Sequence, residues 1–429
     1  MPHLNRFRRL RLTAFLLALL VSALARAGAV DDFENSWTAR ALALQRALDA
    51  DQPLAQAFFP GTHNSYNSKA YQNATRYLDP NQRYSLTDQL RMGIRALELD
   101  VHYTFKIDGW PWNWGNRLLL CHGQDNHVGC SPADRYFRDG VAEIARWLDR
   151  NPSEVILLYI EDHMDGRYGD AIRTLSQAFG QRIFRPSGNG CQGIPMQISK
   201  TDILRAGKQV LIMTDGCRNT EWNRWVFGGF GDYLNGYPTG EVADLGTCLA
   251  SRFSRAFFDS HIVRVYEDRT RLSATFGDPG DPLTPAALAR AVQCGVNMPG
   301  MDMLSPGDGR LDAAVWSWQP GEPNDWAGQE DCAESLGNGR FNDLNCGEFR
   351  PFACQRPGTH DWYVTRQSAP WQEGDALCAA ETGGQYRFAV PRNAWDNENL
   401  KAVKALLGAE RVWLNYSDRI TEGQWQAGF

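Results

Sequence analysis

Polar side chains that could do chemistry follow several apolar runs of the sequence. His63 and Asn64 lie in the stretch GTHNSY at residues 61–66, directly after the apolar run Ala57–Phe59. Later runs end in carboxylates or in a second histidine, namely Glu98 and Asp100, then His122, then Glu161. Each group alone could be structural, as a hydrogen-bonded histidine or half of an ion pair. Their recurrence at the ends of successive runs indicates a shared site instead.

The oxygen donors in this set indicate a hard cation. Asn64, Glu98, Asp100 and Glu161 offer amide or carboxylate oxygens, which suit Ca²⁺ or Mg²⁺ better than zinc. Glu98 and Asp100 lie two residues apart on an expected strand, so their side chains share one face. A cation lowers the pKa of an attacking hydroxyl, and the two histidines remain free to transfer protons and stabilise charge. This combination predicts cleavage of a phosphodiester.

The elements that must position these groups are expected to form a barrel. Apolar runs with little alternation, typical of strands buried on both faces, occur at Ala57–Phe59, Ile94–Val101, Leu118–Cys121, Val155–Ile160, Val210–Met213, Ile262–Tyr266 and Val296–Met303. We expect an eighth strand within residues 221–260. Helical patterns lie between several runs, at Asp139–Asp149, Asp170–Phe179 and Pro285–Val292. The alternation predicts an α/β fold, a TIM-type (β/α)8 barrel with its chemistry at the carboxyl ends of the strands.

Four stretches carry a resemblance to a known family. GTHNSY, LRMGIRALELDVHY, LLLCHGQ and EVILLYIEDHM follow one another across roughly residues 55–165. In order and spacing they resemble the catalytic X domain of phosphatidylinositol-specific phospholipase C, and the likeness continues more loosely to residue 303. The Asn after the first His and the Glu-x-Asp pair are similar to the calcium-dependent branch of that family.

The resemblance implies a role for each residue of the set. Ca²⁺ would be bound by Asn64, Glu98, Asp100 and Glu161. His63 would stabilise the transition state, and His122 would be the general acid for the diacylglycerol oxygen. Glu98 or Glu161 would take the proton from the inositol 2-hydroxyl. The products would be diacylglycerol and a cyclic or open inositol phosphate.

The substrate is less well defined than the reaction. The lysines with which the family holds ring phosphates are not evident, and Asp215 would repel additional phosphates. This favours phosphatidylinositol itself or another simple head group. Alternatives are a glycerophosphodiester or sphingomyelinase-type phosphodiesterase, or a non-catalytic adhesin. The loop GWPWNWGN, residues 109–116, is either a rim that contacts lipid or a loop folded onto the barrel.

The N-terminus is typical of an export signal. Four arginines precede the apolar run Leu12–Leu24, and Ala25-Arg26-Ala27 fits a cleavage site, so we expect a signal peptide at residues 1–27. An uncleaved anchor is the alternative. Cleavage would remove five arginines and no acids, which changes the net charge from −6 to −11. We therefore expect a secreted or periplasmic protein with no nucleic-acid partner and no basic patch for anionic membranes, so that lipid contact would be apolar or metal-mediated.

All ten cysteines follow the expected cleavage site, and in an exported chain an even number predicts disulfides, with structural zinc as the alternative. Proximity suggests the pairs Cys121–Cys130, Cys191–Cys217 and Cys248–Cys294. The composition changes near residues 306–309, which predicts a barrel at residues 28–310 and a second domain at 311–429.

The second domain resembles a C-type lectin domain in an unusual order. Residues 316–355 resemble its second half, which implies Ca²⁺ and sugar ligation by Glu322, Asn324, Glu330, Asn342 and Asp343. The usual Trp before Asn-Asp is Phe341 here. The following stretches, WYVTRQSAPWQEGDALCAAETGG, VPRNAWDNENLKAVKALLG and VWLNYSDRITEGQW, resemble the first half.

This order implies one circularly permuted α+β domain. The fold's usual pairing would join Cys354 to Cys378 and Cys332 to Cys346. The alternative is two truncated copies, each with half a core. In the second expected helix, Leu400, Val403, Leu406 and Leu407 form one stripe. The domain could bind a glycan, a protein or neither, and Asn415-Tyr416-Ser417 matches a glycosylation site.

Overall fold

The computed structural model of the 429-residue chain describes residues 28–109, 111–188, 190–229, 237–238, 255–271 and 282–428. The predicted signal peptide at residues 1–27 lies outside these ranges. Within them, no helix combines the length and the apolar character needed to cross a bilayer.

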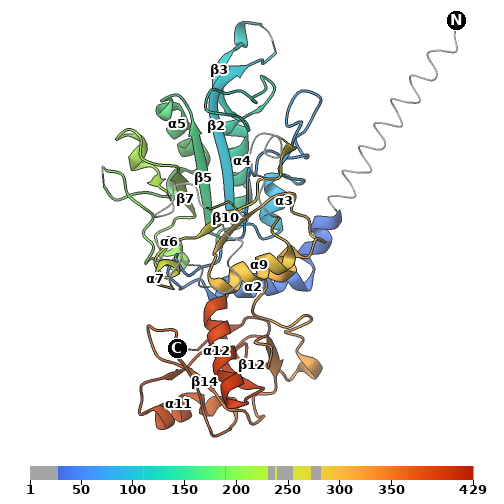
Figure 1. The fold of residues 1–429 in the computed structure, drawn as a ribbon, viewed down its shortest axis with the longest axis vertical. Helices are drawn as coiled ribbons and strands as arrows, with labels where there is room; N and C mark the ends of the chain where they lie inside the picture. The colour runs from blue at the N-terminus through green and yellow to red at the C-terminus, as the bar shows by residue number, and fades with distance from the viewer. Residues whose placement is uncertain are drawn as a thin grey trace, which may run out of the picture.

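A curled sheet of parallel strands forms the first part of the molecule (Figure 1). The strands follow the order β6, β7, β5, β2, β1, β11, β10, β9, and every pair along this path is parallel. Their bounds are β1 Gly61–Thr62, β2 Ala96–Lys106, β5 Ile156–His163, β6 Ile183–Phe184, β7 Val210–Thr214, β9 Tyr237–Pro238, β10 Arg264–Tyr266 and β11 Met298–Met301, with β8 Phe227–Gly228 beside β7. The predicted α/β barrel class is confirmed, in the form of a half-barrel of curled parallel strands.

Helices accompany this sheet. They are α2 Trp37–Leu48, α3 Leu86–Arg91, α4 Phe137–Leu148, α5 Tyr168–Phe179, α6 Lys200–Arg205, α7 Arg255–Phe258, α9 Pro285–Cys294 and α10 Arg310–Ala314. The predicted stripe of α4 is buried, including Val141, Ile144 and Leu148. A Cβ at Gly140 would lie 2.5 Å from Leu120 Cδ1, so glycine permits the close approach of α4 to the neighbouring strand.

The run Leu118–Cys121 is not a barrel strand, contrary to the prediction. It lies mainly in β3 (Gly115–Leu120), which pairs antiparallel with β2, from Val101 opposite Leu120 to Lys106 opposite Gly115. The short β4 (Arg135–Tyr136) pairs with β3. An apolar run carries no information on strand direction, which explains the error. We call residues 101–120 the hairpin arm; in Figure 1 it projects from one end of the molecule.

Two other strand predictions differ from the structure. The run Ala57–Phe59 is buried but precedes β1, and its Phe59 N–H donates to the Asn297 carbonyl at 2.7 Å. The interval 221–260, expected to hold one strand, contains β8 and β9, and residues 230–236 and 239–254 within it lie outside the described ranges.

The tail forms two small antiparallel sheets and two helices. One sheet has the order β13 (Phe341–Leu344), β12 (Cys332–Ser335), β17 (Val412–Ser417), β18 (Gln426–Ala427), the other the order β15 (Trp362–Val364), β14 (Ala353–Gln355), β16 (Arg387–Phe388), and the helices are α11 (Gly374–Thr382) and α12 (Ala394–Leu407). Strand β12 of the first tail segment pairs with β17 of the second. The two segments therefore share one sheet, which favours a single domain over two truncated copies.

The stripe predicted for α12 is wrong at its C-terminal end. Leu400 is fully buried, but Leu406 and Leu407 are 86% and 60% exposed. The buried face continues instead to Lys404, whose Nζ donates to the carbonyl and hydroxyl oxygens of Ser335 at 2.9 and 2.8 Å. The last turn of the helix thus extends past the domain core.

Four of the five predicted disulfides are present, namely Cys121–Cys130, Cys191–Cys217, Cys332–Cys346 and Cys354–Cys378. Cys294 is also disulfide-bonded, and its predicted partner Cys248 lies outside the described residues. This number of disulfides fits an oxidising compartment.

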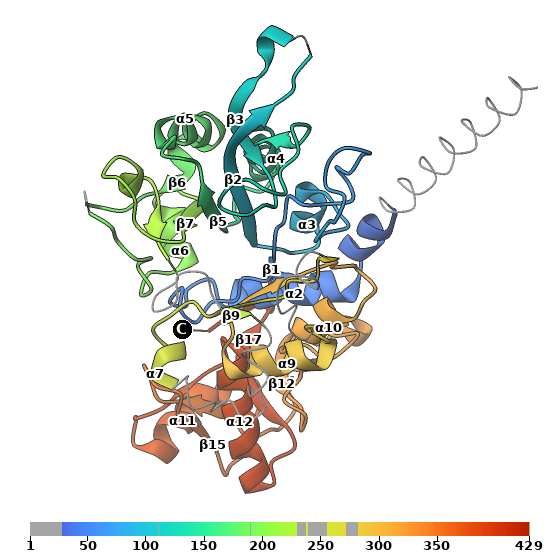
Figure 2. The same ribbon diagram turned by 45° about the horizontal axis from the view of Figure 1, so that its top comes forward.

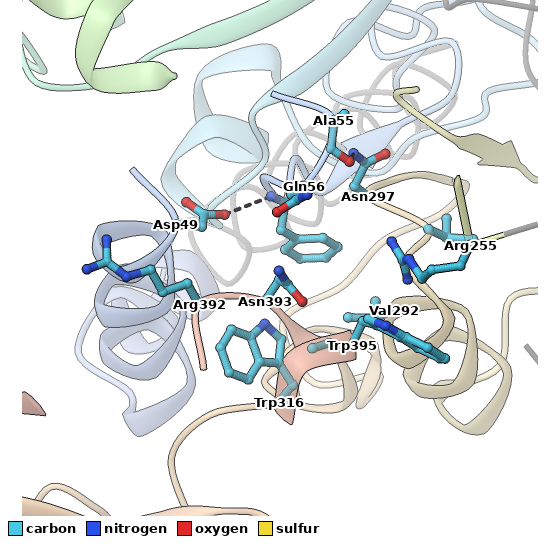
Figure 3. A pocket seen from close by; sticks show the side chains of 14 residues that line it. Asp49, Ala55, Gln56, Arg255, Val292, Asn297, Trp316, Arg392, Asn393 and Trp395 are labelled. Carbon is cyan, nitrogen blue, oxygen red and sulfur yellow. Dashed lines mark hydrogen bonds between the residues drawn. The ribbon is translucent and has the colours of Figure 1, made fainter. Parts of the chain in front are cut away.

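The tail packs against α9 of the barrel through α12. At this junction Trp37 Nε1 donates to the Glu322 carbonyl at 2.7 Å. Residues of both parts, including Asp49, Arg255 and Trp395, line a cavity of about 30 Å³ (Figure 3). This volume holds about two water molecules, so the cavity is too small for an organic ligand.

A histidine joins the two parts. His360 of the tail places Nε2 3.1 Å from the carboxylate of Asp259, which follows α7, and Nδ1 2.6 Å from that of Asp396 on α12. Hydrogen bonds to Asp259 and Asp396 raise the pKa of His360 to about 9, although partial burial opposes the charge.

This contact predicts a pH-dependent contribution to stability. The folded-state pKa of about 9 lies above the ordinary value near 6.5, so protonated His360 stabilises the folded chain fully below about pH 6.5, and this is lost as the pH rises to 9. We expect His360→Gln to lower the melting temperature most near pH 6 and progressively less toward pH 9.5. A difference from wild type that stays constant over this range would contradict the assignment.

Candidate active site

The register of β1 places His63 between two carboxylates. Thr62 of β1 pairs with Met301 of β11 on one side and with Leu97 of β2 on the other. His63 follows Thr62 directly, so it lies beside Asp302 and Glu98, the residues that follow these two partners. His63 Nδ1 lies 3.2 Å from Asp302 Oδ1, and Nε2 lies 4.0 Å from Glu98 Oε2. Burial opposes a charge on His63, but the two carboxylates outweigh it and raise its pKa to about 10. His63 is therefore an imidazolium at neutral pH.

Three carboxylates meet beside this histidine. Asp100 of β2 is opposite Glu161 of β5 in the parallel ladder, and Glu98 is on the same face of β2. One oxygen from each of Glu98, Asp100 and Glu161 lies within 4.8 Å of the others, and Glu98 and Asp100 are almost fully buried. Burial, and then the charges of Glu161 and Glu98, raise the pKa of Asp100 well above its usual range. Such a cluster favours a bound cation.

The side chain of Asn64 lies between the cluster and His63. With its amide nitrogen toward Asp100 it donates to that carboxylate at 2.7 and 2.9 Å, and its oxygen accepts from His63 Nε2 at 3.2 Å. Its amide oxygen would face the carboxylates only if a cation were bound between them. The left-handed backbone of Asn64, with φ 44°, aims this side chain at the carboxylates, and its N–H donates to Glu98 at 3.1 Å.

Two residues of β10 complete this side of the site, and the sequence reasoning missed them. Arg264 is 3% exposed and its guanidinium donates to Glu98 Oε2. The ring of Tyr266 lies 5.2 Å from that of His63. Both residues belong to a run that the sequence analysis treated as buried strand, and only the alternation of Arg264 and Tyr266 on one face could have indicated a role.

The sequence analysis also missed Asp302, whose carboxylate is held by a network of buried hydrogen bonds. Its oxygens accept from Asn81 Nδ2 at 3.0 Å and from the Arg269 N–H at 2.7 Å, besides facing His63. Its own N–H donates to Glu267, which also accepts from Arg310 of α10. Asp302 follows β11 within the run Val296–Met303, so its position at a strand end was a usable signal.

His122 reaches the site by the return of the hairpin arm. The Cys121 N–H donates to the Asp100 carbonyl at 3.2 Å, and the Cys121–Cys130 disulfide closes the loop that follows. His122 lines a cavity of about 230 Å³. Burial, and then the charge of His63, lower the pKa of His122. His63 is therefore held in its charged form, whereas His122 favours the neutral form.

Three further histidines lie behind the carboxylates. The rings of His102 and His163 stack at 4.2 Å, and His102 Nδ1 lies 3.0 Å from His127 Nδ1. His163 Nε2 lies 3.1 Å from Glu161 Oε1, an interaction that lowers the pKa of Glu161 against the effect of burial. Burial, and then the neighbouring histidines, lower the pKa of His102 to about 2. None of these three histidines was among the residues predicted for the site.

The predicted ligands of the tail also come together, with one exception. Asp343 Oδ2 accepts from the Asn324 N–H at 2.9 Å, Asn324 donates to Glu322, and the Trp326 N–H donates to Glu330 at 2.9 Å. Asn342 instead donates to Glu334 and to the Asp343 carbonyl. Burial, and then Asp343, raise the pKa of Glu322 to about 7.

A second acidic cluster in the tail was not predicted. Oxygens of Asp331, Asp418 and Glu422 lie within 4.8 Å of one another. Asp418 is 3% exposed, its Oδ1 has no hydrogen-bond partner, and burial raises its pKa to about 6. These residues come from the two ends of the tail and meet because β12 pairs with β17.

Comparisons with known proteins agree with this architecture. Residues 17–308 match the family described as the Rv2075c PI-PLC-like domain. The uncharacterized protein Rv2075c of Mycobacterium tuberculosis is 32% identical over 409 residues, which are 90% of this chain and 81% of that protein. Collectin-10 of Xenopus tropicalis is 49% identical over 39 residues, 9% of this chain and 14% of its own.

Solved phospholipases C of bacteria are among the structural neighbours. A mutant of the phosphatidylinositol-specific phospholipase C of Staphylococcus aureus has a TM-score of 0.43 and 11% identity, over 65% of this chain and 98% of its own. The calcium-dependent phosphoinositol-specific enzyme of a Pseudomonas species has a TM-score of 0.35 and 17% identity, over 61% and 95%. On the family match and the identity to Rv2075c, the chain belongs to the Rv2075c PI-PLC-like family and carries a PI-PLC-like catalytic domain.

The charge on His63 provides a test of the site that needs no substrate. Because Asp302 and Glu98 raise its pKa to about 10, Asp302→Asn should make His63 titrate at a lower pH. The measurement is a titration of imidazole nitrogen signals by NMR. Asp125→Asn, which removes a carboxylate 3.0 Å from His163, is the control and should leave His63 unchanged. An unaltered His63 titration in the Asp302 variant would show that this pair does not set the charge.

Proposed function

We propose that the protein is an exported, calcium-dependent phosphodiesterase of phosphatidylinositol-specific phospholipase C type, with a lectin-like second domain. The observation that carries the proposal is the meeting of Glu98, Asp100 and Glu161 beside one charged and one neutral histidine. Few structural roles require buried like charges next to such a pair.

The cation would be held by Asn64, Glu98, Asp100 and Glu161. When bound, Ca²⁺ neutralises phosphate charge and lowers the pKa of the attacking inositol hydroxyl. Glu98 is 4% exposed and bonded to Arg264, whereas Glu161 is 35% exposed, so we assign proton uptake from the hydroxyl to Glu161. His163 Nε2 lies 3.1 Å from Glu161 Oε1 and lowers the pKa of Glu161, which keeps this carboxylate ionised and able to accept the proton.

The two histidines would have separate roles, one in stabilising the phosphate and one in protonating the leaving group. Protonated His63 donates to the phosphate oxygen that gains charge in the transition state. His122 is neutral in the free protein, and a phosphodiester anion in its cavity would raise its pKa toward the acid form. It then delivers the proton to the diacylglycerol oxygen as that oxygen leaves. The ring of Tyr266 beside His63 limits how the substrate can approach.

The head group is proposed to be phosphatidylinositol or a similarly simple phosphodiester. The argument from Asp215 is weaker than the sequence indicated, because Arg218 Nη2 lies 2.9 Å from its carboxylate and partly neutralises it. A glycerophosphodiester or sphingomyelinase-type reaction remains the alternative within the same fold. Attack by the internal 2-hydroxyl gives a cyclic inositol phosphate, which neither alternative produces.

The assay is hydrolysis of phosphatidylinositol vesicles by the mature protein, with phosphorus NMR of the soluble products. His63→Ala and His122→Ala should each lower turnover by at least about 10²-fold, as loss of an acid–base group does. EDTA should abolish turnover, and added Ca²⁺ should restore it. His261→Gln changes a histidine outside the site and serves as the control. Equal activity of all three variants would leave the adhesin alternative standing.

The tail is proposed to bind Ca²⁺ and through it a glycan. Ligation requires ionised Glu322, whose pKa is about 7, so affinity for Ca²⁺ should fall as the pH drops below 7. Calorimetry of the full-length protein at pH 6 and 8 measures this. Glu322→Gln should remove the pH-dependent part and leave Ca²⁺ binding by the barrel in place. Loss of all Ca²⁺ binding in that variant would place the only site in the tail.

A further inference from the structure

The hairpin arm extends the active-site side of the barrel. Strand β2 continues past Asp100 to Lys106, a reach of about 20 Å at ~3.3 Å per residue. The carboxyl ends of parallel barrel strands form the mouth, so the arm projects on the side from which a substrate reaches Asp100 and His122. Figures 1 and 2 both show it at the end of the molecule opposite the C-terminal domain.

Large apolar side chains are exposed at the tip of this arm. Trp112 is 79% exposed, Trp114 44%, Phe105 44% and Ile107 48%. The alternative that this loop folds onto the barrel is therefore wrong for the described tryptophans. Tryptophan rings favour the boundary between lipid and water. On the loops around His122, Leu78 and Val128 are also exposed, by 68% and 62%.

Arginines gather in a groove beside the arm. Arg117 of β3, Arg138 of α4 and Arg173 of α5 line a cavity of about 390 Å³ with one carboxylate among its walls, Asp170. Helices α4 and α5 begin there, and neither N-cap side chain, Tyr136 or Arg167, caps the helix, so the positive ends of both helix dipoles lie at the groove together with Asp139 and Asp170 of their first turns. These arginines come from three separate segments, so the sequence did not indicate that they gather; Arg173 pairs with Asp170, and Arg138 lies 3.8 Å from Asp139.

The arrangement matches the layers of an anionic membrane surface. Arg117 lies three residues after Trp114, which is about 10 Å along an extended strand. When the tryptophans at the tip enter the boundary between head groups and acyl chains, the arginines would therefore lie at the level of the lipid phosphates. The chain as a whole carries a net charge of −6, so an anionic surface is repelled unless it meets this face. A bilayer offers an apolar layer to the tip of the arm and anionic phosphates to the arginine groove at the same time.

We propose that the hairpin arm and this arginine groove form a docking surface for an anionic phospholipid bilayer. Docking there holds the barrel mouth toward the lipid. The biological use of this surface rests on the proposed phosphodiesterase function, whereas the binding itself requires no catalysis.

The test is co-sedimentation with vesicles that contain no inositol lipid, in EDTA. Phosphatidylserine–phosphatidylcholine vesicles should bind the full-length protein more tightly than phosphatidylcholine alone, and salt should remove the difference. The double variant Trp112→Ala, Trp114→Ala should bind both compositions at least about 10-fold more weakly. Arg138→Gln with Arg173→Gln should lose about 25-fold on the anionic vesicles only, from about 5-fold per arginine.

Matched controls lie elsewhere on the molecule. Arg205 is 72% exposed and pairs with Asp202 three residues before it, as Arg173, 69% exposed, pairs with Asp170. Arg205→Gln should therefore bind like wild type, and so should Phe349→Ala, which removes an aromatic ring that is 64% exposed on the C-terminal domain.

Three outcomes would overturn the docking surface. The first is that the tryptophan variant binds vesicles as tightly as wild type. The second is that the arginine variant and its Arg205→Gln control lose the same affinity for anionic vesicles. The third is that light scattering shows a wild-type dimer that the tryptophan variant does not form. The last would assign the arm to a second copy of the chain. Vesicle binding without hydrolysis of any phosphodiester would instead reject the proposed function and leave the docking surface intact.

Discussion

The meeting of three carboxylates on two adjacent parallel strands, two of them almost fully buried, is the constraint to which the rest of the barrel mouth responds. Glu98 is compensated by Arg264, and Glu161 by His163. Asp100 receives a hydrogen bond from the Tyr66 hydroxyl at 2.8 Å, a neutral donor that cannot balance a charge. The raised pKa of Asp100 follows from this shortfall. A cation at that point would relieve the repulsion, and without one the Asn64 amide can donate to the Asp100 carboxylate at 2.7 and 2.9 Å.

The charge states of His63 and His122 follow from the same distribution of carboxylates around the barrel mouth. His63 lies between the acidic cluster and Asp302, whereas His122 borders an open cavity and is affected mainly by burial and by His63. The position of Asp302 depends in turn on Glu267 and Arg310. Because Arg310 begins α10, which packs against α9 and α2, the support of His63 extends to the base of the barrel.

The sequence predicts those site residues whose polar side chains lie at or directly after the end of an apolar run of the chain. The structure brings His63, Asn64, Asp100 and Glu161 together, and each belongs to a recognisable local stretch. Asp302 and Arg264 were missed, since their partners are more than a hundred residues away and register alone brings them together. For His122 the predicted route was wrong. His122 arrives there because an antiparallel strand returns to the mouth, a direction that an apolar run does not encode.

The two additions to the barrel occupy opposite ends because of where each joins the chain. The hairpin arm is an extension of β2 beyond its carboxyl end, so it can only lengthen the mouth. The tail follows α9 and α10, and it packs against α9 through α12 at the base. The pairing of β12 with β17 and the Cys354–Cys378 disulfide join its two segments. A glycan held by the tail and a bilayer held by the arm would therefore be contacted from opposite ends, so either could bind without displacing the other.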